Sequence, residues 1–272
     1  MGLRSRIEAV KKHASIYVSF FRMYLKSRLI YKVDFALGLM SQLLNLVFSV
    51  AFLGLLFTQV ESLNGWTFNE ILLLAGFSGF VLNLHHVFLF APYRMGEDYI
   101  LSGRMDRYLV RPLNVLFQVF ARYVSEDNIA KMAANAALIA YAWNRIGLTL
   151  TPEKLVYGVF AVVSGVMVIA SIFLVFGSTA FWTGRSKAVF WLFFQVSNFR
   201  KYPYSIFSGP VKILLVTLIP VAFTSFFPTT FLLGRDGWKL WQLGTLVAGP
   251  LLYFLAYRFW LYGLSNYSST GS

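Results

Sequence analysis

Long apolar runs separated by short polar segments dominate this chain. Runs at 33–58, 68–91, 155–182 and 240–262 are each long enough to cross a hydrocarbon layer of about 30 Å as a helix, and a shorter run at 127–143 is near the lower limit of length. Apolarity sustained over such lengths predicts transmembrane helices rather than strands or short core helices. The pattern therefore predicts an all-α polytopic membrane protein.

The segment 188–233 leaves two arrangements open. In the first, 188–204 crosses the membrane and 210–233 dips back as a re-entrant hairpin from outside. In the second, 188–204 lies on the cytoplasmic face and 211–233 crosses. Arg200, Lys201 and Lys212 favour the second by charge. Either arrangement gives six transmembrane helices in total.

Residues 1–32 carry eight Lys and Arg residues and a single acid. Ile7, Val10 and Tyr17 recur on one helical face, and basic residues occupy the other. This separation predicts an amphipathic helix lying in the plane of the lipid headgroups, with a solvated basic tail as the alternative. The six-span domain then covers 33–272.

Composition narrows the class of protein further. Charged residues make up 13% of the chain, against about 25% in soluble domains. The net charge is +13, and the basic residues lie beside the apolar runs. Anionic membrane lipids are therefore the expected partner of this charge, and nucleic acid is not.

The distribution of positive charge predicts the orientation. The 1–32 arm and the loop 93–114 are rich in Lys and Arg, whereas the loop 59–67 has none. Under the positive-inside rule, the arm and the loop 93–114 face the cytoplasm. Six crossings then place both termini in the cytoplasm.

Motifs of enzyme chemistry are absent from the sequence. It contains no G-x-x-x-x-G-K-[ST], H-E-x-x-H or G-x-S-x-G pattern, and no cysteine. His85 and His86 are adjacent, so on a helix their side chains point about 100° apart and make a poor metal chelate. We therefore expect no catalytic residues, no metal and no cofactor in this chain.

Polar residues enter the third apolar run. Asn128, Lys131 and Asn135 share one helical face. One interpretation is the polar entrance of a translocation path, because charges within a span usually face protein or water. The other is an interfacial helix start with Lys131 snorkelling toward the headgroups. Elsewhere, small residues predict close helix packing: Gly76, Gly79, Gly158, Ala161, Gly165, Ala180 and Gly184. The pairs Ala161/Gly165 and Ala180/Gly184 have the small-xxx-small spacing of a dimer face.

The cytoplasmic loop 93–114 has the composition of a docking element. Gly96 and Gly103 are expected to bracket a single short helix that binds a soluble partner, with a solvated loop as the alternative. Charged residues would form the polar contacts and apolar ones the anchor. The candidate docking residues are Met95, Glu97, Asp98, Tyr99, Ile100, Arg104, Asp106 and Arg107.

Three motifs follow one another along the chain. They are SGRMDRYLVRPL at 102–113, then RKYP at 200–203 with IPVAF at 219–223 and Pro228, and last YSSTGS at 267–272. In this order they resemble motifs of a bacterial family of ATP-binding-cassette type-2 exporter permeases. The family's corresponding motifs are a G-x-hydrophobic-D-x-x-L-x-R-P-L loop, an R-Y-P … I-P-x-A-F … P region and a Y-x-S-x-G-S tail.

This resemblance implies a six-span permease subunit in a bacterial inner membrane. A second copy or a paralogous permease would complete the pathway, and a separate ATP-binding-cassette ATPase subunit would bind ATP and Mg²⁺. The loop 93–114 would be the coupling helix, and 210–233 would be re-entrant. A polytopic membrane enzyme acting on lipid and a non-transporting assembly factor remain as alternatives.

Overall fold

The computed structural model of the protein describes residues 32–123, 125 and 127–269. The amphipathic helix expected over residues 1–32 lies, apart from Lys32, outside the described residues. The described residues form helices and loops, with no β-strand among them. The expected all-α class is therefore confirmed.

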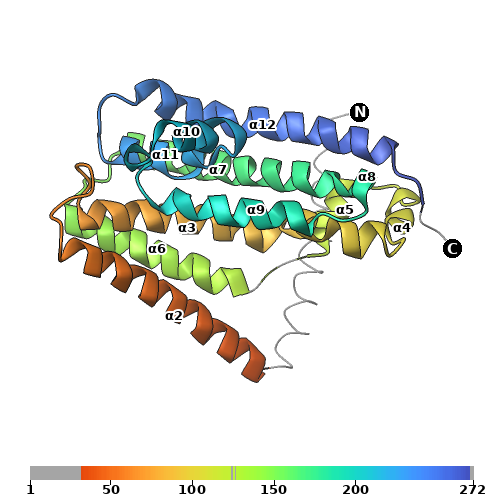
Figure 1. Cartoon of the computed structure of the whole chain (residues 1–272), viewed down its shortest axis with the longest axis horizontal. Coiled ribbons are helices and arrows are strands. Elements are labelled where there is room, and N and C mark those ends of the chain that lie inside the picture. The colour runs from red at the N-terminus through yellow and green to blue at the C-terminus, as the bar shows by residue number, and fades with distance from the viewer. Residues whose placement is uncertain (1–31, 124, 126, 270–272) are drawn as a thin grey trace.

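Long helices lie side by side along the long axis of the molecule (Figure 1). Each of the five apolar runs is helical, with bounds within a few residues of those expected. These helices are α2 (Lys32–Phe57), α3 (Phe68–Leu89), α6 (Asp127–Ile146), α7 (Pro152–Ser178) and α12 (Lys239–Ser265). Three described helical stretches are long and apolar enough to cross a membrane: Phe68–Leu89, Pro152–Thr183 and Lys239–Ser265.

Local capping explains where α3 and α7 begin. Thr67 accepts a hydrogen bond from the backbone N–H of Glu70, and the Glu70 carboxylate accepts one from the backbone N–H of Thr67. This reciprocal capping box satisfies amides that have no partner inside the helix. At the start of α7 the Thr151 hydroxyl accepts a hydrogen bond from the Lys154 backbone N–H, and Pro152 follows at the first helical position.

Short helices gather at one end of the molecule, at the right of Figure 1. We call this end, defined by residues 91–123 and 180–187, the basal end, and the opposite end, defined by the loop 58–67, the apical end. The basal elements are η1 (Ala91–Arg94), η2 (Met95–Ile100), α4 (Met105–Leu109), α5 (Val115–Ala121) and α8 (Ala180–Thr183).

The segment 187–233 is broken into short helices. It comprises α9 (Lys187–Ser197), η3 (Asn198–Lys201), η4 (Tyr204–Ile206), α10 (Gly209–Ile213), η5 (Leu214–Leu218), η6 (Val221–Thr224) and α11 (Phe226–Leu232). The chain bends by 71° between Gly209–Leu218 and Val221–Leu232, at Ile219 and Pro220. Proline favours such a break because it lacks the N–H that a continuing helix needs.

Contacts at the apical end show how this segment runs. Asn64 donates from Nδ2 to the Ser205 carbonyl at 3.1 Å, so the chain has reached the apical end by residue 205. Arg235 donates from Nη2 to the Gly65 carbonyl at 2.7 Å, so it is again at that end at residue 235. In between, the Thr224 backbone lies against Gly165, near the middle of α7. The stretch 205–235 therefore enters the bundle and leaves it at the same end.

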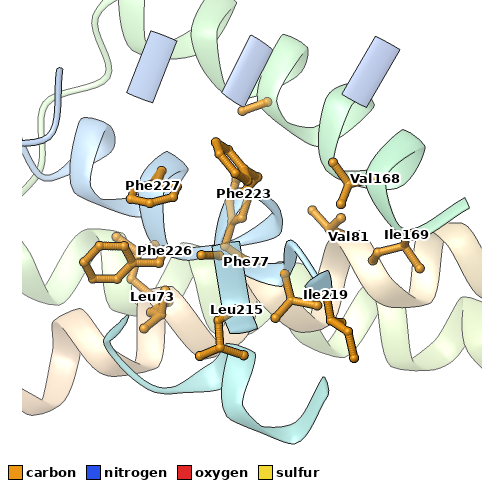
Figure 2. Close-up of a cluster of buried hydrophobic side chains, with 14 of the residues drawn as sticks. Leu73, Phe77, Val81, Val168, Ile169, Leu215, Ile219, Phe223, Phe226 and Phe227 are labelled. Atoms are coloured by element: carbon orange, nitrogen blue, oxygen red, sulfur yellow. The ribbon is translucent and has the colours of Figure 1, made fainter. Parts of the chain in front are cut away.

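In the core, the stretch 205–235 packs against α3 and α7 (Figure 2). The side chains at its centre are all buried and come from α3, α7, η5, η6, α11 and Ile219: Leu73, Phe77, Val81, Val168, Ile169, Leu215, Ile219, Phe223, Phe226 and Phe227. Apolar contacts between α3, α7 and the stretch 205–235, which we call the bent segment, thus fix how far this segment reaches into the bundle.

Small residues allow the helices to approach closely, as expected. A Cβ at Gly76 would lie 3.0 Å from Ile139 of α6, and one at Gly165 would lie 2.9 Å from Val81 of α3. Gly79 leaves room for the Asn135 side chain, which a Cβ there would overlap. The expected close packing is therefore confirmed at Gly76, Gly79 and Gly165, where it serves contacts inside one chain, whereas a Cβ at Gly158 would meet no atom within 4 Å among the described residues.

Candidate functional site

The basal loop contains two short helices rather than the single one expected. Gly103 adopts φ +62° and separates η2 from α4. A left-handed glycine ends a helix without a Cβ clash, and the Gly103 N–H bonds to the Ile100 carbonyl at 3.0 Å. Arg104, Asp106 and Arg107 therefore belong to a separate helical turn, which packs against η2 through Tyr108 and Tyr99.

The apolar residues expected to anchor a partner are buried inside the chain. Met95, Tyr99 and Ile100 expose 0%, 7% and 4% of their surface and belong to a basal apolar cluster with Leu174 and Trp260. Burial raises the pKa of the Tyr99 hydroxyl well above its usual range. These residues hold the loop in place, so a partner must find its apolar contacts elsewhere.

The two acids at the start of the loop have partners within the chain. Glu97 lies 3.8 Å from Lys187, and Asp98 lies 2.7 Å from Arg94. Gly96 packs directly against the 184–186 turn, where a Cβ would come within 2.7 Å of the Gly184 carbonyl. These contacts fasten η2 to the turn between α8 and α9.

An exposed surface remains around α4. Arg104 and Arg107 are exposed, as is Arg111 just beyond the helix. Val110 is 83% exposed, and Leu101 and Leu109 are also open to the outside. This mixture of arginine and aliphatic side chains, which we call the basal surface (Leu101, Arg104, Arg107, Leu109, Val110 and Arg111), is typical of a protein-binding face.

Asp106 joins the basal loop to the end of the chain. Its carboxylate accepts hydrogen bonds from the Tyr267 hydroxyl at 3.1 Å and the Ser269 hydroxyl at 2.7 Å. Partial burial and then the neighbouring Asp106 carboxylate raise the pKa of Tyr267, which keeps its hydroxyl a donor. Two of the sequence motifs, the D of the loop and the Y-x-S of the tail, therefore meet in space.

The three polar residues expected to share a site on α6 do not all lie in one place. Asn128 donates to the Ser125 hydroxyl at 2.6 Å and lies outside the groove described next. Asn135 is buried near the middle of α6, donates to the Lys131 carbonyl at 2.7 Å and lies against Gly79. Lys131 and Asn135 line a common groove.

This groove has a volume of about 710 Å³ and is bounded by α2, α3, α6 and η3. We call it the lateral groove. Arg200 and Lys201 of η3 join Lys131 there, and neither was expected from the sequence as a site residue. Their signal is two adjacent charges inside an otherwise apolar stretch, from which the sequence predicts orientation and a motif resemblance but no site. The remaining polar lining consists of Asn45, Ser49, Ser78, Asn83, Asn135 and Asn198.

The adjacent histidines are core residues. His85 is fully buried, and its ring centroid lies 4.5 Å from that of Phe173. His86 bonds through Nδ1 to the Leu82 carbonyl at 2.7 Å. Among the described residues, no group of three metal-binding side chains comes together.

A family model described as "ABC-2 family transporter protein" matches residues 43–271. The chain belongs to this family. The match includes the basal loop, the lateral groove and the C-terminal contact to Asp106, so all three are parts of one transporter fold. Among curated proteins, none matches the chain.

Family membership and the apolar helices make this an integral membrane protein of the ABC-2 transporter family. The resemblance seen in the three sequence motifs is thereby confirmed. The family supports a permease role rather than that of a catalytic subunit.

Proposed function

We propose that the chain is the membrane-spanning permease subunit of an ATP-binding-cassette exporter. A second copy or a paralogous permease completes the translocation pathway. A separate ATPase subunit binds ATP and Mg²⁺ and drives transport from the basal end. The membrane is the inner membrane of a bacterium.

The observation that carries this proposal is the basal surface. Its arginines and aliphatic side chains are exposed, while the residues beneath them are buried in the chain's own core. A rigid, exposed, mixed surface suits transmission of force from a docked partner, because movement of the surface must move the helices below it. Buried Met95, Tyr99 and Ile100 supply that connection, and exposed Arg104 and Arg107 supply the contact.

The proposed topology has six crossings: α2, α3, α6, α7, the α9–η4 stretch and α12. The stretch 210–233 is a re-entrant hairpin from outside, supported by the apical contacts on either side of it, from Asn64 to Ser205 and from Arg235 to Gly65. The arginine-rich basal end then faces the cytoplasm, in agreement with the positive-inside rule. Both termini lie on that side.

A co-purification experiment tests the proposal. The chain, tagged and extracted from its native membranes in a mild detergent, should bring down a polypeptide that a photoreactive ATP analogue labels. Arg104→Glu with Arg107→Glu should reduce both the recovered polypeptide and its ATP hydrolysis at least about tenfold, since an interface loses charge pairs and gains repulsion.

Arg145→Glu provides the matched control. Arg145 is an exposed arginine near the apical end of α6, so its reversal should leave the partner bound. Recovery of no nucleotide-binding polypeptide would favour a lipid-modifying enzyme or an assembly factor instead. Full recovery with the double variant would show that the basal surface is not the docking site.

A further inference from the structure

The lateral groove concentrates positive charge at the middle of the bundle. Lys131, Arg200 and Lys201 line it, and its lining contains no acidic side chain. Among the ion pairs between described residues, none includes any of these three. Cations in such a place are costly, and they persist where a ligand or water-filled path uses them.

Three contacts fix the depth of the groove. Asn135 lies against Gly79, and both are near the middle of their helices. The Arg200 carbonyl accepts a hydrogen bond from the Ser225 hydroxyl at 2.8 Å. The residue before Ser225, Thr224, lies against Gly165 near the middle of α7. The groove beside Asn135 and Arg200 therefore lies between the two ends of the bundle.

Arg200 has unused donor capacity. Its Nη1 bonds to the Ser197 carbonyl at 2.6 Å and to the Ser197 hydroxyl at 3.2 Å. Its Nε is buried and meets no hydrogen-bond acceptor among the described residues. Because Arg200 lines the groove and pairs with no carboxylate among the described residues, its guanidinium is suited to a planar or tetrahedral anion.

The wall of the groove that α2 forms is mainly apolar. α2 contributes Leu46, Phe48, Val50, Phe52 and Leu53 to the lining, together with the polar Asn45 and Ser49. α2 lies at the edge of the bundle (Figure 1), and Val47 and Leu55, α2 side chains that do not line the groove, are 60% and 67% exposed. A ligand with an acyl chain would therefore find a wall that matches the chain and an opening beside the lipid.

We propose that the lateral groove binds an anionic amphiphile, with its charged headgroup on Lys131, Arg200 and Lys201 and its alkyl chain along α2. The polar amides of Asn83, Asn135 and Asn198 surround the headgroup. The inference that the bound amphiphile is the transported substrate rests on the proposed function. Binding itself is measured on the isolated chain without an ATPase, so the two proposals fail separately.

The test uses 11-(dansylamino)undecanoic acid, a fluorescent amphiphilic carboxylate, titrated into the purified chain in dodecyl maltoside. Saturable fluorescence enhancement is expected, and dodecyl phosphate should displace the probe. Dodecyltrimethylammonium and inorganic phosphate at the same concentrations should not displace it. Lys131→Gln, Lys201→Gln and Arg200→Gln should each weaken probe binding about tenfold, the effect expected for loss of one charge-assisted contact.

Arg145→Gln is the control, because it removes an exposed cation from the same helix as Lys131 but outside the groove. Its affinity should equal that of the unaltered chain. Lys131 and Lys201 are partly exposed, so their variants test the site even where Arg200→Gln does not fold. Equal displacement by the cationic amphiphile or by inorganic phosphate, or unchanged affinity in both lysine variants, would overturn the proposal.

Discussion

Asp106 in the basal loop and Tyr267 beyond the last helix are joined by a hydrogen bond of 3.1 Å, although 161 residues separate them in sequence. Asn114 makes a parallel connection, donating to the Tyr257 hydroxyl of α12 at 3.0 Å. The loop is thus tied to α12 and to the tail at two points. A movement of the loop must therefore displace the end of α12.

Removal of this contact should loosen α4. Asp106→Ala deletes the acceptor of two hydrogen bonds, and we expect a local loss of about 1–2 kcal/mol. Amide hydrogen exchange should rise in residues 105–109 and 266–269. Glu61→Ala, which removes an exposed acid from the apical loop, should leave exchange in these residues unchanged. Equal exchange in the Asp106 variant would show that the contact contributes nothing to loop stability.

Gly79 is expected to be intolerant of any side chain. A Cβ at this position would overlap the Asn135 side chain, so Gly79→Ala should destabilise the chain by about 1–3 kcal/mol through overpacking. Thermal unfolding in detergent measures this. Gly158→Ala is the matched control, since it lies in α7 with no atom within 4 Å of the added Cβ. Similar unfolding of both variants would contradict the close α3–α6 contact.

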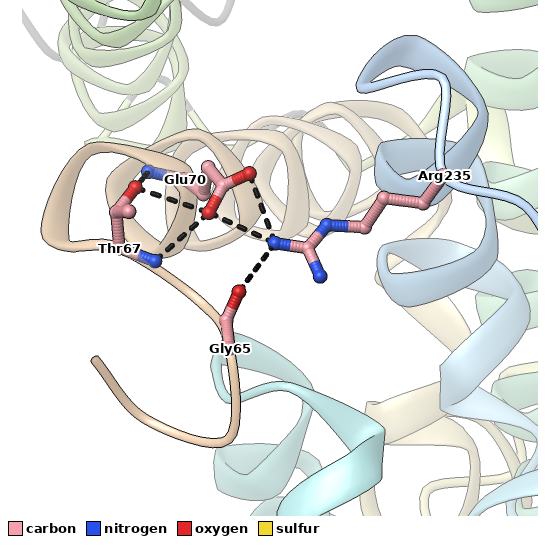
Figure 3. A network of polar contacts seen from close by, with 4 residues as sticks. All are labelled: Gly65, Thr67, Glu70 and Arg235. Carbon is pink, nitrogen blue, oxygen red and sulfur yellow. Dashed lines mark hydrogen bonds and ion pairs between the residues drawn. The ribbon is translucent and has the colours of Figure 1, made fainter.

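The Glu70–Arg235 pair fastens the far end of the bent segment to the start of α3 (Figure 3). Arg235 Nη2 lies 2.9 Å from both carboxylate oxygens of Glu70, and its guanidinium lies 4.3 Å from the centre of the Trp66 ring. Arg235→Ala should therefore lower stability by about 1.5–3 kcal/mol.

Lys239 offers the control for this prediction. Its pair with Asp236 spans 3.8 Å, and both side chains are more than four-fifths exposed, at 82% and 91%. Lys239→Ala should therefore have almost no effect on the unfolding midpoint. An equally small effect of Arg235→Ala would mean that the apical contact does not hold the bent segment.

Cysteine labelling decides the proposed course of 205–235. Ser208 is exposed and close to the apical contact of Ser205, and the sequence has no natural cysteine. Ser208→Cys should react with a membrane-impermeant maleimide added outside intact spheroplasts. Ser102→Cys, in the exposed basal loop, should react only after permeabilisation. Labelling of Ser208→Cys only from the cytoplasmic side would contradict the proposed topology, in which Ser208 lies outside.

The sequence by itself determined the helical class and the position of the long helices. Apolar length is a local property, since every backbone group in lipid must be satisfied within its own helix. Capping at Thr67 and Thr151 is equally local, and it sets the beginnings of α3 and α7. The three motifs were also sufficient to identify the family, which the match over residues 43–271 confirms.

Only the tertiary structure decided which neighbours surround the residues of the basal loop and of the lateral groove. Met95, Tyr99 and Ile100 have the composition of a docking anchor, yet packing from α7 and α12 buries them. Arg200 and Lys201 look like markers of a cytoplasmic loop, yet the break at Pro220 and the contact from Ser225 hold them beside Lys131. Burial and charge clustering depend on segments distant in sequence, so a pattern along one helix predicts its apolar face but not its neighbours.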